Sequence, residues 1–375
     1  MADVIVIGGG IAGCSTAFYL AADGAEVLLL EQSDLNLGAS GNNAGSLHAQ
    51  VQHEPFLEMG EAWARQFGPA LPFFAHSIAL WQAAGPLLQA DLEVSLDGGI
   101  LVATDEQQMR MIEAKARIER SFGVPIELLD RQTLLARAPY LSGHAIGGAY
   151  CPIEGKASPL TAAPAFARAA ERLGTRILRG QRVLGIERHG DGYQILCTAG
   201  SHRARRVIDA AGVEAGRVAG LVGARIDIQA FPIQLSVTEP AEALIGHLVY
   251  SARHRLTMKQ THQGTILIGG GWPALVDCSG RPQVSAASLS RNLAVALEVV
   301  PAVASLNVMR TWAAIVNGTA NWKPLIGELP GAPGFFLNYV PWMGFTGGPA
   351  GGRIVASLAQ GRTPEVDFDL APLRP

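Results

Sequence analysis

Hydrophobic positions near the start of the chain form two short unbroken runs, at residues 4–7 and 27–30. A helix-compatible segment at residues 12–22 separates them. Apolar runs of this length are typical of parallel strands that are buried on both faces. The pattern therefore predicts a strand–helix–strand unit that ends at the acidic residue Glu31.

The rest of the chain mixes helical and alternating patterns, which predicts an α/β fold (α+β overall). Apolar runs and alternation predict strands at residues 98–103, 147–151, 182–187, 193–198, 206–209, 231–238, 248–250, 256–260, 265–268 and 335–339. Helical spacing predicts helices at 56–89 (interrupted at 68–72), 105–122, 128–141, 158–173, 213–222, 285–300 and 349–360. Pro159 suits the first turn of its helix, and residues 311–326 are expected to be irregular.

Three glycines follow the first strand with the spacing G-x-G-x-x-G: Gly8, Gly10 and Gly13. One makes the tight turn, one lets the backbone approach a pyrophosphate, and one lets helix pack on strand. The helix start supplies free N–H groups for phosphate, and Glu31 can accept hydrogen bonds from ribose hydroxyls. The motif predicts a dinucleotide site but leaves NAD and FAD open, with an ordinary glycine-rich βαβ turn as the alternative.

A run of small residues, GASGNNAGSLHAQ, occupies positions 38–50. Small residues are needed where backbone lies against a flat ligand, whereas the alternative is a surface loop. The glycines at 269–271 do not form a second dinucleotide-binding motif (fingerprint), because Trp272 and Pro273 follow directly and no helix begins there. A flavoprotein reductase that uses NAD(P)H needs two nucleotide sites, so a single fingerprint indicates that electrons enter from an organic substrate.

Composition narrows the class of protein. A chain of 375 residues, 49% of them hydrophobic, can bury a large core, either in two domains or in one domain with large insertions. A net charge of −3 gives no reason to expect a nucleic-acid partner. The four cysteines lie far apart, which argues against a local iron–sulfur or zinc site and fits a reducing compartment. With no apolar run near 18 residues and no basic leader, we expect no transmembrane segment and a cytoplasmic enzyme.

Several motifs in this order resemble the FAD-dependent D-amino acid oxidase superfamily, which includes glycine oxidase and sarcosine oxidase. They are VIVIGGGIAG with Glu31, GASGNNAG, RVIDAAG at 206–212, the segment from Trp312 to 327, and GFTGGP at 344–349. The sequence GASGNNAGSLH is most similar to that of the β subunits of multi-subunit dehydrogenases for D-hydroxyproline or proline and of opine oxidases. The resemblance covers nearly the whole chain.

The resemblance implies a Rossmann-like FAD-binding lobe and a mostly antiparallel-sheet substrate lobe. The first would comprise residues 1–85, 145–223 and 325–375, and the second 86–144 and 224–324. FAD is the implied cofactor, with FMN at a subunit interface as a further expectation. The implied FAD contacts are Gly8, Gly10, Ile11, Ala12, Gly13, Glu31, Gln32, Ala39, Ser40, Asn43, Ala44, Gly45, Ser46, Val183, Ala211, Gly212, Gly344, Phe345, Thr346 and Gly347.

The implied reaction is hydride transfer from the Cα–H of a small amino-acid-derived amine to flavin N5, giving an imine. Electrons would then pass to partner subunits that carry further redox centres. Alternatives are a stand-alone oxidase that makes hydrogen peroxide and a non-catalytic scaffold subunit. An NAD dehydrogenase is disfavoured by residues 38–45 and by the terminal glycine block.

One position departs from the family pattern. Glycine oxidase-like members place a carboxylate-binding arginine four residues after the tryptophan of the Trp312 segment, where this chain has Val316. Candidate replacements are His48, Arg253, Arg255, Lys259, Arg310 and Lys323. Tyr250 and His254 could contact substrate or simply pack in the core. Of all these, the residues expected to be catalytic are His48, Tyr250 and Lys259.

Overall fold

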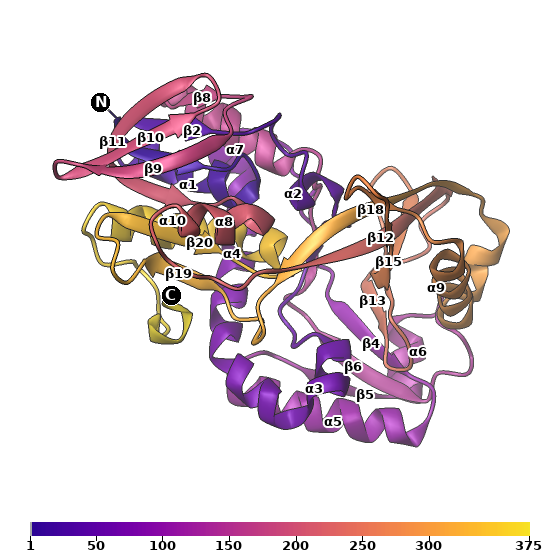
Figure 1. Ribbon diagram of the computed structural model, residues 1–375. Helices are drawn as coiled ribbons and strands as arrows, with labels where there is room; N and C mark the ends of the chain where they lie inside the picture. The colour runs from indigo at the N-terminus through magenta and orange to yellow at the C-terminus, as the bar shows by residue number, and fades with distance from the viewer. Residues whose placement is uncertain (1) are drawn as a thin grey trace.

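The computed structural model describes residues 2–375, and two eight-stranded sheets define its two lobes (Figure 1). The first sheet has the order β19-β20-β11-β1-β2-β8, with the β9–β10 hairpin attached to β11. The second has the order β18-β12-β15-β14-β13-β4-β6-β5. This mixed architecture confirms the predicted fold class, with a Rossmann-like lobe beside a mostly antiparallel one.

The first sheet is parallel from β8 to β20, and antiparallel strands flank it. Its strands are β1 (Ala2–Ile7), β2 (Val27–Leu30), β8 (Arg176–Leu178), β9 (Val183–His189), β10 (Gly192–Cys197), β11 (Gly200–Asp209), β19 (Leu325–Glu328) and β20 (Phe335–Tyr339). The strand β2 is buried along its whole length, as its unbroken apolar run predicts. Helix α1 (Ile11–Ala22) packs against both α7 (Ala162–Arg172) and α10 (Gly344–Ala359).

The second sheet is antiparallel except where β13 pairs with β4. Its strands are β4 (Gly99–Ala103), β5 (Glu127–Asp130), β6 (Gly147–Cys151), β12 (Gln229–Pro240), β13 (Leu248–Ser251), β14 (Thr257–Gln260), β15 (Thr265–Pro273) and β18 (Val308–Gly318). The strand β15 runs straight through the three glycines at 269–271, so no helix begins there, as predicted. The long strands β12 and β18 run from one lobe toward the other (Figure 1).

The remaining elements cover or connect the sheets. The other helices are α2 (Ala39–Asn42), α3 (His53–Phe67), α4 (Leu71–Leu88), α5 (Glu106–Ser121), α6 (Arg131–Arg137), α8 (Ala215–Gly220) and α9 (Ala286–Val299). Short strand pairs join β3 (Ser46–Leu47) to β7 (Gly155–Lys156), and β16 (Leu275–Val276) to β17 (Pro282–Gln283). Within residues 2–375 we find no helix that is both long and apolar enough to cross a bilayer.

Two predicted segments have a different secondary structure. The helix expected at 128–141 is the strand β5 followed by α6, because β5 pairs with β6 and Asp130 caps α6 by accepting from the N–H of Thr133. The irregular segment expected at 311–326 begins with the regular strand β18, which pairs with β12 over most of its length. In both cases long-range pairing overrides the local pattern.

Several helices begin or end away from their predicted bounds, and α3 begins at His53, three residues before its predicted start. The helix α7 begins at Ala162, so Pro159 precedes it and is not in its first turn. The segment 213–222 forms a short 3₁₀ turn and then α8. The helix α10 begins at Gly344 and not at Pro349, so the glycines expected in a loop are helical.

The glycines of α10 serve close packing. A Cβ on Gly348 would lie 2.7 Å from the Ile11 side chain, and a Cβ on Gly352 would lie 2.5 Å from Ser15 Oγ. Helices α1 and α10 therefore approach more closely than any larger residue would permit.

The division of the chain into lobes follows from the sheets. Strand β6 falls within the segment 145–223, yet it pairs with β4 of the second sheet. We propose to place that boundary after Cys151 and to keep the other predicted bounds.

Candidate functional site

The glycine turn between β1 and α1 has the geometry that its spacing predicts. Gly8 has φ +111°, and a Cβ on it would lie 2.5 Å from the carbonyl oxygen of Ala210. A Cβ on Gly13 would lie 1.9 Å from the carbonyl oxygen of Gly8. Only glycine allows the turn and the helix to pack in this way.

Two side chains hold the glycine turn in place. Ser40 Oγ accepts a hydrogen bond from the N–H of Ile11, the first residue of α1, at 2.9 Å. The Glu31 carboxylate accepts from the N–H of Gly9 at 2.6 Å and from the N–H of Ser33 at 2.8 Å. The turn, the helix start and the acidic residue thus form one connected surface.

This surface lines a cavity of about 520 Å³, which we call the larger cavity. Most predicted cofactor residues line it: Gly8, Gly10, Ile11, Ala12, Glu31, Gln32, Ala39, Ser40, Asn43, Ala211, Gly212, Gly344 and Phe345. The start of α10, which carries a partial positive charge, also lines it.

The other predicted cofactor residues lie elsewhere. Ala44, Ser46 and Thr346 line an adjoining smaller cavity of about 130 Å³. Four predicted residues line neither cavity: Gly13, Gly45, Val183 and Gly347. Gly13 packs under Gly8, and Val183 is buried in β9. A Cβ on Gly45 would clash with the Ala157 carbonyl, and a Cβ on Gly347 would clash with the Phe73 ring. These four positions therefore serve packing, and their predicted contact with the cofactor stays a prediction.

The residues of the larger cavity fit a long polar cofactor. Asn36, Asn338 and Tyr339 line it, and each has a buried oxygen without a hydrogen-bond partner within residues 2–375. These oxygens are closed off from the cavity, and Asn338 Oδ1 points at Gly351 of α10, so a ligand in the cavity would not reach them. The glycine turn, the start of α1 and Glu31 lie along the cavity wall, and this arrangement suits a dinucleotide.

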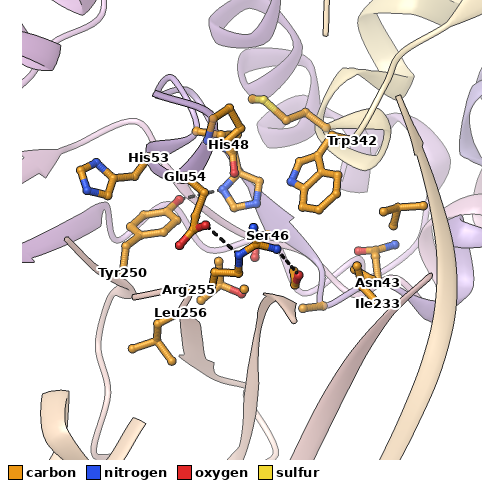
Figure 2. A pocket seen from close by; sticks show the side chains of 18 of the residues that line it. Asn43, Ser46, His48, His53, Glu54, Ile233, Tyr250, Arg255, Leu256 and Trp342 are labelled. Atoms are coloured by element: carbon orange, nitrogen blue, oxygen red, sulfur yellow. Dashed lines mark hydrogen bonds and ion pairs between the residues drawn. The ribbon is translucent and has the colours of Figure 1, made fainter. Parts of the chain in front are cut away.

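The two cavities meet at four shared residues: Asn43, Val316, Trp342 and Phe345. Trp342 has φ +53°, a conformation that costs of order 1–3 kcal/mol for a bulky residue. Its backbone N–H donates to the Asn317 carbonyl, and its indole ring packs edge-on against Trp322. These contacts hold the strained tryptophan at the junction, where Figure 2 shows its ring facing the cavity.

Three histidines line the smaller cavity, His48, His53 and His254, and the first two are neutral at physiological pH. Burial, helped by the charge of Lys259, lowers the pKa of His48 to about 3. Burial and the charge of Lys115 lower the pKa of His53 to about 4, although its hydrogen bond to the Ala252 carbonyl acts in the opposite direction. Neutral imidazoles can accept a proton from a bound ligand.

Arg255 is the one arginine that lines the smaller cavity (Figure 2). Its guanidinium donates to Glu54 at 2.7 Å, to Glu58 at 3.0 Å and to the Gly271 carbonyl at 3.0 Å. Of the six candidate replacements for the missing arginine, only His48 and Arg255 line a cavity. Arg253 pairs with Glu298, and Lys259 lies buried behind Ser46, to which it donates a hydrogen bond.

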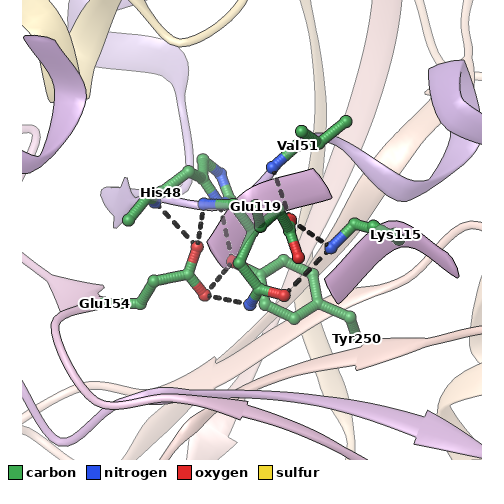
Figure 3. A network of polar contacts seen from close by, with 8 residues as sticks. His48, Val51, Lys115, Glu119, Glu154 and Tyr250 are labelled. Atoms are coloured by element: carbon green, nitrogen blue, oxygen red, sulfur yellow. Dashed lines mark hydrogen bonds and ion pairs between the residues drawn. The ribbon is translucent and has the colours of Figure 1, made fainter. Parts of the chain in front are cut away.

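Behind the smaller cavity lies a buried polar network that the sequence analysis missed (Figure 3). Glu154 is fully buried, and Tyr250 donates to its Oε2 at 3.0 Å. The Tyr250 hydroxyl also lies 2.7 Å from Nδ1 of His48. Lys115 continues the network, since it pairs with Glu119 at 2.6 Å and donates to Gln50. No local motif marks Glu154, because its partners come from distant segments.

Thr346 at the start of α10 joins the site to the rest of the first lobe. Its Oγ1 accepts from the N–H of His48 at 3.0 Å. Its carbonyl accepts from Ser77 Oγ at 2.6 Å and from the indole N–H of Trp81 at 2.9 Å. These bonds fix the loop that carries His48 against the helix end.

Among residues 2–375 there is no cluster of three or more metal-binding side chains. We therefore assign no metal site within the described part of the chain.

Comparisons with known proteins agree with this geometry. The family "DAO: FAD dependent oxidoreductase" matches residues 3–358. An opine oxidase subunit of Agrobacterium tumefaciens strain Ach5 is 29% identical over 344 residues, which cover 89% of this chain and 87% of that protein. The beta subunit of sarcosine oxidase from an Arthrobacter species is 28% identical over 366 residues, which cover 94% of this chain and 86% of that protein.

A similar solved structure is glycine oxidase from Geobacillus kaustophilus, with a TM-score of 0.87 and 25% identity. The similarity covers 100% of this chain and 98% of that one. Since the family match spans nearly the whole chain and the larger cavity suits its cofactor, this protein belongs to the DAO family of FAD-dependent oxidoreductases.

Proposed function

We propose that this chain is the catalytic, β-type subunit of an amino-acid dehydrogenase or oxidase that acts on secondary amines such as D-hydroxyproline, proline or an opine. FAD, when bound, supplies the acceptor for the hydride that leaves the substrate Cα. The names of two relatives, one a subunit of an opine oxidase and the other the beta subunit of a sarcosine oxidase, support both the substrate class and the subunit role.

The observation that carries this proposal is the pair of cavities that meet at Val316. An amine must lose its proton before its Cα–H can leave as hydride, and a neutral imidazole within reach can accept that proton. His48 is such an imidazole, whereas Nδ1 of His53 is buried away from the cavity and Nε2 of His53 lies 3.0 Å from the Ala252 carbonyl. Apolar side chains such as Ile233 and Leu256 line the rest of the cavity. The smaller cavity therefore suits an amine whose carboxylate is not held at position 316.

Arg255 is our candidate for the carboxylate contact. A guanidinium has five N–H donors, and three of them are engaged by Glu54, Glu58 and the Gly271 carbonyl. Two donors remain for a ligand, in a group whose orientation the two glutamates already fix. A preoriented guanidinium loses little side-chain entropy when it binds.

Lys259 has a positioning role in this proposal. It lines neither cavity, but it donates to Ser46, which lines the smaller one. Burial, together with the charge of Lys156, lowers the pKa of Lys259 to about 7. We propose that Lys259 orients the Ser46 hydroxyl and, when charged, adds to the effect of burial that keeps His48 neutral.

An anaerobic bleaching test examines the proposal. D-hydroxyproline, proline, sarcosine, glycine and an opine are added one at a time to the purified yellow protein, and the flavin band is followed. Loss of the band with a secondary amine supports the proposed function. A yellow protein that none of them bleaches would favour a non-catalytic subunit.

The carboxylate contact is tested with a matched pair of variants. Arg255→Gln should raise the substrate dissociation constant by about tenfold or more, because a charge-assisted hydrogen bond contributes roughly 1.5–3 kcal/mol. Arg253→Gln is the control, since Arg253 pairs with Glu298 away from both cavities. Equal affinities in the two variants would exclude Arg255 as the clamp.

A second candidate function is a stand-alone oxidase that releases hydrogen peroxide, which the similarity to glycine oxidase favours. Readmitting air to the bleached protein separates the two. Fast return of colour with peroxide supports the oxidase. Slow return supports partner subunits with further redox centres, among which FMN at a subunit interface stays a prediction.

A further inference from the structure

Three residues form a hydrogen-bonded row behind the smaller cavity, and any catalytic role for them rests on the proposed function. Glu154 lies between β6 and β7, Tyr250 lies on β13, and His48 follows β3. His48 and Tyr250 also line the cavity, whereas Glu154 is completely buried. The row therefore leads from the cavity into the interior.

The hydrogen bonds around Glu154 are those of an ionised carboxylate. Its Oε1 accepts from the backbone N–H groups of Ala49 at 2.8 Å and Gln50 at 3.0 Å. Its Oε2 accepts from the Gln50 side-chain amide at 2.8 Å and from the Tyr250 hydroxyl at 3.0 Å. Four donors thus fill the acceptor positions of the two oxygens, and three of them can only donate.

This arrangement determines where the other protons lie. Because the Tyr250 hydroxyl donates to Glu154, its oxygen must accept from Nδ1–H of His48, 2.7 Å away. A neutral imidazole with a proton on Nδ1 has a lone pair on Nε2. Within residues 2–375 no group bonds to that Nε2, and His48 lines the cavity, so the lone pair is free to meet a ligand.

We propose that His48, Tyr250 and Glu154 form a proton relay that deprotonates the substrate ammonium and stores the proton on the buried carboxylate. The ammonium N–H bond breaks as an N–H bond forms on His48 Nε2. The Nδ1 proton moves to the Tyr250 oxygen, and the hydroxyl proton moves to Glu154. One proton is transferred in total and nothing is oxidised, so the step leaves a free amine ready for hydride loss.

The relay removes two opposite charges from a low-dielectric region. Before transfer, a substrate cation faces a buried carboxylate; afterwards both groups are neutral. Burial raises the pKa of Glu154, and the hydrogen bonds from Gln50, Ala49 and Tyr250 only partly oppose this rise. The buried carboxyl therefore has a reason to take the proton.

Other charged or titratable groups lie close to the relay. Lys115 and Glu119 on α5 form an ion pair that is linked to Glu154 through Gln50. Lys259 on β14 acts on His48, whereas Glu154, Cys151 and Glu119 raise the pKa of Tyr250. The Cys151 thiol is uncharged from pH 6 to 10, because burial raises its pKa. Because all of these remain in a Tyr250 variant, a change in its pH profile reports on the relay itself.

The kinetic test is Tyr250→Phe, which removes the central hydroxyl and keeps the ring. Flavin reduction by the best secondary amine is followed anaerobically from pH 6 to 10. At pH 7 we expect a rate about 10²–10⁴-fold below that of the unchanged protein, in line with the usual contribution of acid–base catalysis. As the pH rises toward the pKa of the substrate ammonium the difference should shrink, because more free amine then enters from solution.

The matched control is Tyr140→Phe. Tyr140 makes the same kind of hydrogen bond, 2.7 Å from Nδ1 of His247, and lines neither cavity. The Tyr140→Phe variant should leave the pH profile of flavin reduction unchanged. A Tyr250→Phe defect of constant size at every pH would indicate a structural role and overturn the relay.

A second readout needs neither substrate nor turnover. Nitrogen-15 NMR of histidine-labelled protein, with His48→Gln to assign the signal, distinguishes Nδ1–H from Nε2–H tautomers. We expect the Nδ1–H tautomer for His48 at pH 7, and its loss in Tyr250→Phe. An Nε2–H tautomer or an imidazolium at pH 7 would overturn the relay. If no amine bleaches the flavin but the Nδ1–H tautomer is found, the proposed function fails while the proton arrangement stands.

Discussion

The side chain of Ser40 covers the start of α1, where its Oγ accepts a hydrogen bond from the N–H of Ile11 at 2.9 Å. The two residues are 29 positions apart, so the short helix α2 beyond β2 caps the helix end that the glycine motif assigns to the cofactor pyrophosphate. The serine can hold the helix end before the cofactor arrives, and its hydroxyl can donate a hydrogen bond to phosphate afterwards.

Ser40→Ala should therefore lower stability and cofactor affinity together. Loss of a cap costs about 1 kcal/mol, and a hydrogen bond to a charged phosphate contributes roughly 1.5–3 kcal/mol. We expect the FAD dissociation constant to rise about tenfold or more when the apoprotein is titrated and flavin fluorescence is followed. Ser305→Ala, in an exposed 3₁₀ turn, is the control. Unchanged FAD affinity would show that Ser40 does not contact phosphate.

Lys115 and Glu119 form a buried ion pair, with side chains only 2% and 1% exposed. Lys115→Met should destabilise the protein by about 3–5 kcal/mol, because Glu119 is left buried without its partner. The double variant Lys115→Met with Glu119→Gln should recover much of that loss, which urea unfolding can measure. A double variant as unstable as the single one would contradict this explanation.

His53 should make stability fall on acidification. Its folded pKa of about 4 lies below its ordinary value of 6.5, so the unfolded chain binds the proton first. The penalty is absent above pH 6.5 and grows as the pH falls toward 4, by up to about 1.4 kcal/mol per pH unit. Between pH 7.5 and pH 5, the free energy of unfolding measured with a chemical denaturant should fall less for His53→Gln than for the unchanged protein. His262→Gln, at an exposed position, should behave like the unchanged protein.

Val316→Arg should change the substrate range. Val316 lines both cavities, and an arginine there would occupy much of the smaller cavity of about 130 Å³. We expect flavin reduction by proline and opines to fall by roughly tenfold or more, while a carboxylate clamp for glycine appears. Val316→Leu separates loss of space from gain of charge. Equal bleaching by opines in Val316→Arg and in the unchanged protein would contradict the placement of Val316 at the site.

Local patterns predicted the elements whose signals are local. The glycine turn, Glu31 and the buried strands β1 and β2 follow from spacing and apolar runs, and the structure has them at the expected positions. The strand β18 could not be recognised in this way, because its regularity comes from pairing with β12, about 80 residues earlier in the chain.

The site was only partly predictable for the same reason. His48 was noticed because it follows the loop of small residues, and Tyr250 because it lies in the expected second lobe. Glu154 has no local signal, since it is 96 residues from Tyr250 and 104 from Gln50. Its position depends on Gly99 of β4, where a Cβ would lie 1.9 Å from the carboxylate. Only the folded sheet brings these residues together.

The close packing of α1 on α10 has a consequence for biosynthesis. Gly352 rests against Ser15, so the first helix of the chain finds its partner only after more than 300 further residues have been made. At roughly 5–20 residues per second, the ribosome needs about 15–70 s to supply them. During that interval the apolar face of α1 lacks one of its neighbours, and the cavity for FAD lacks the part of its wall that residues 338–345 supply. We therefore expect tight binding of FAD only after this segment has been made.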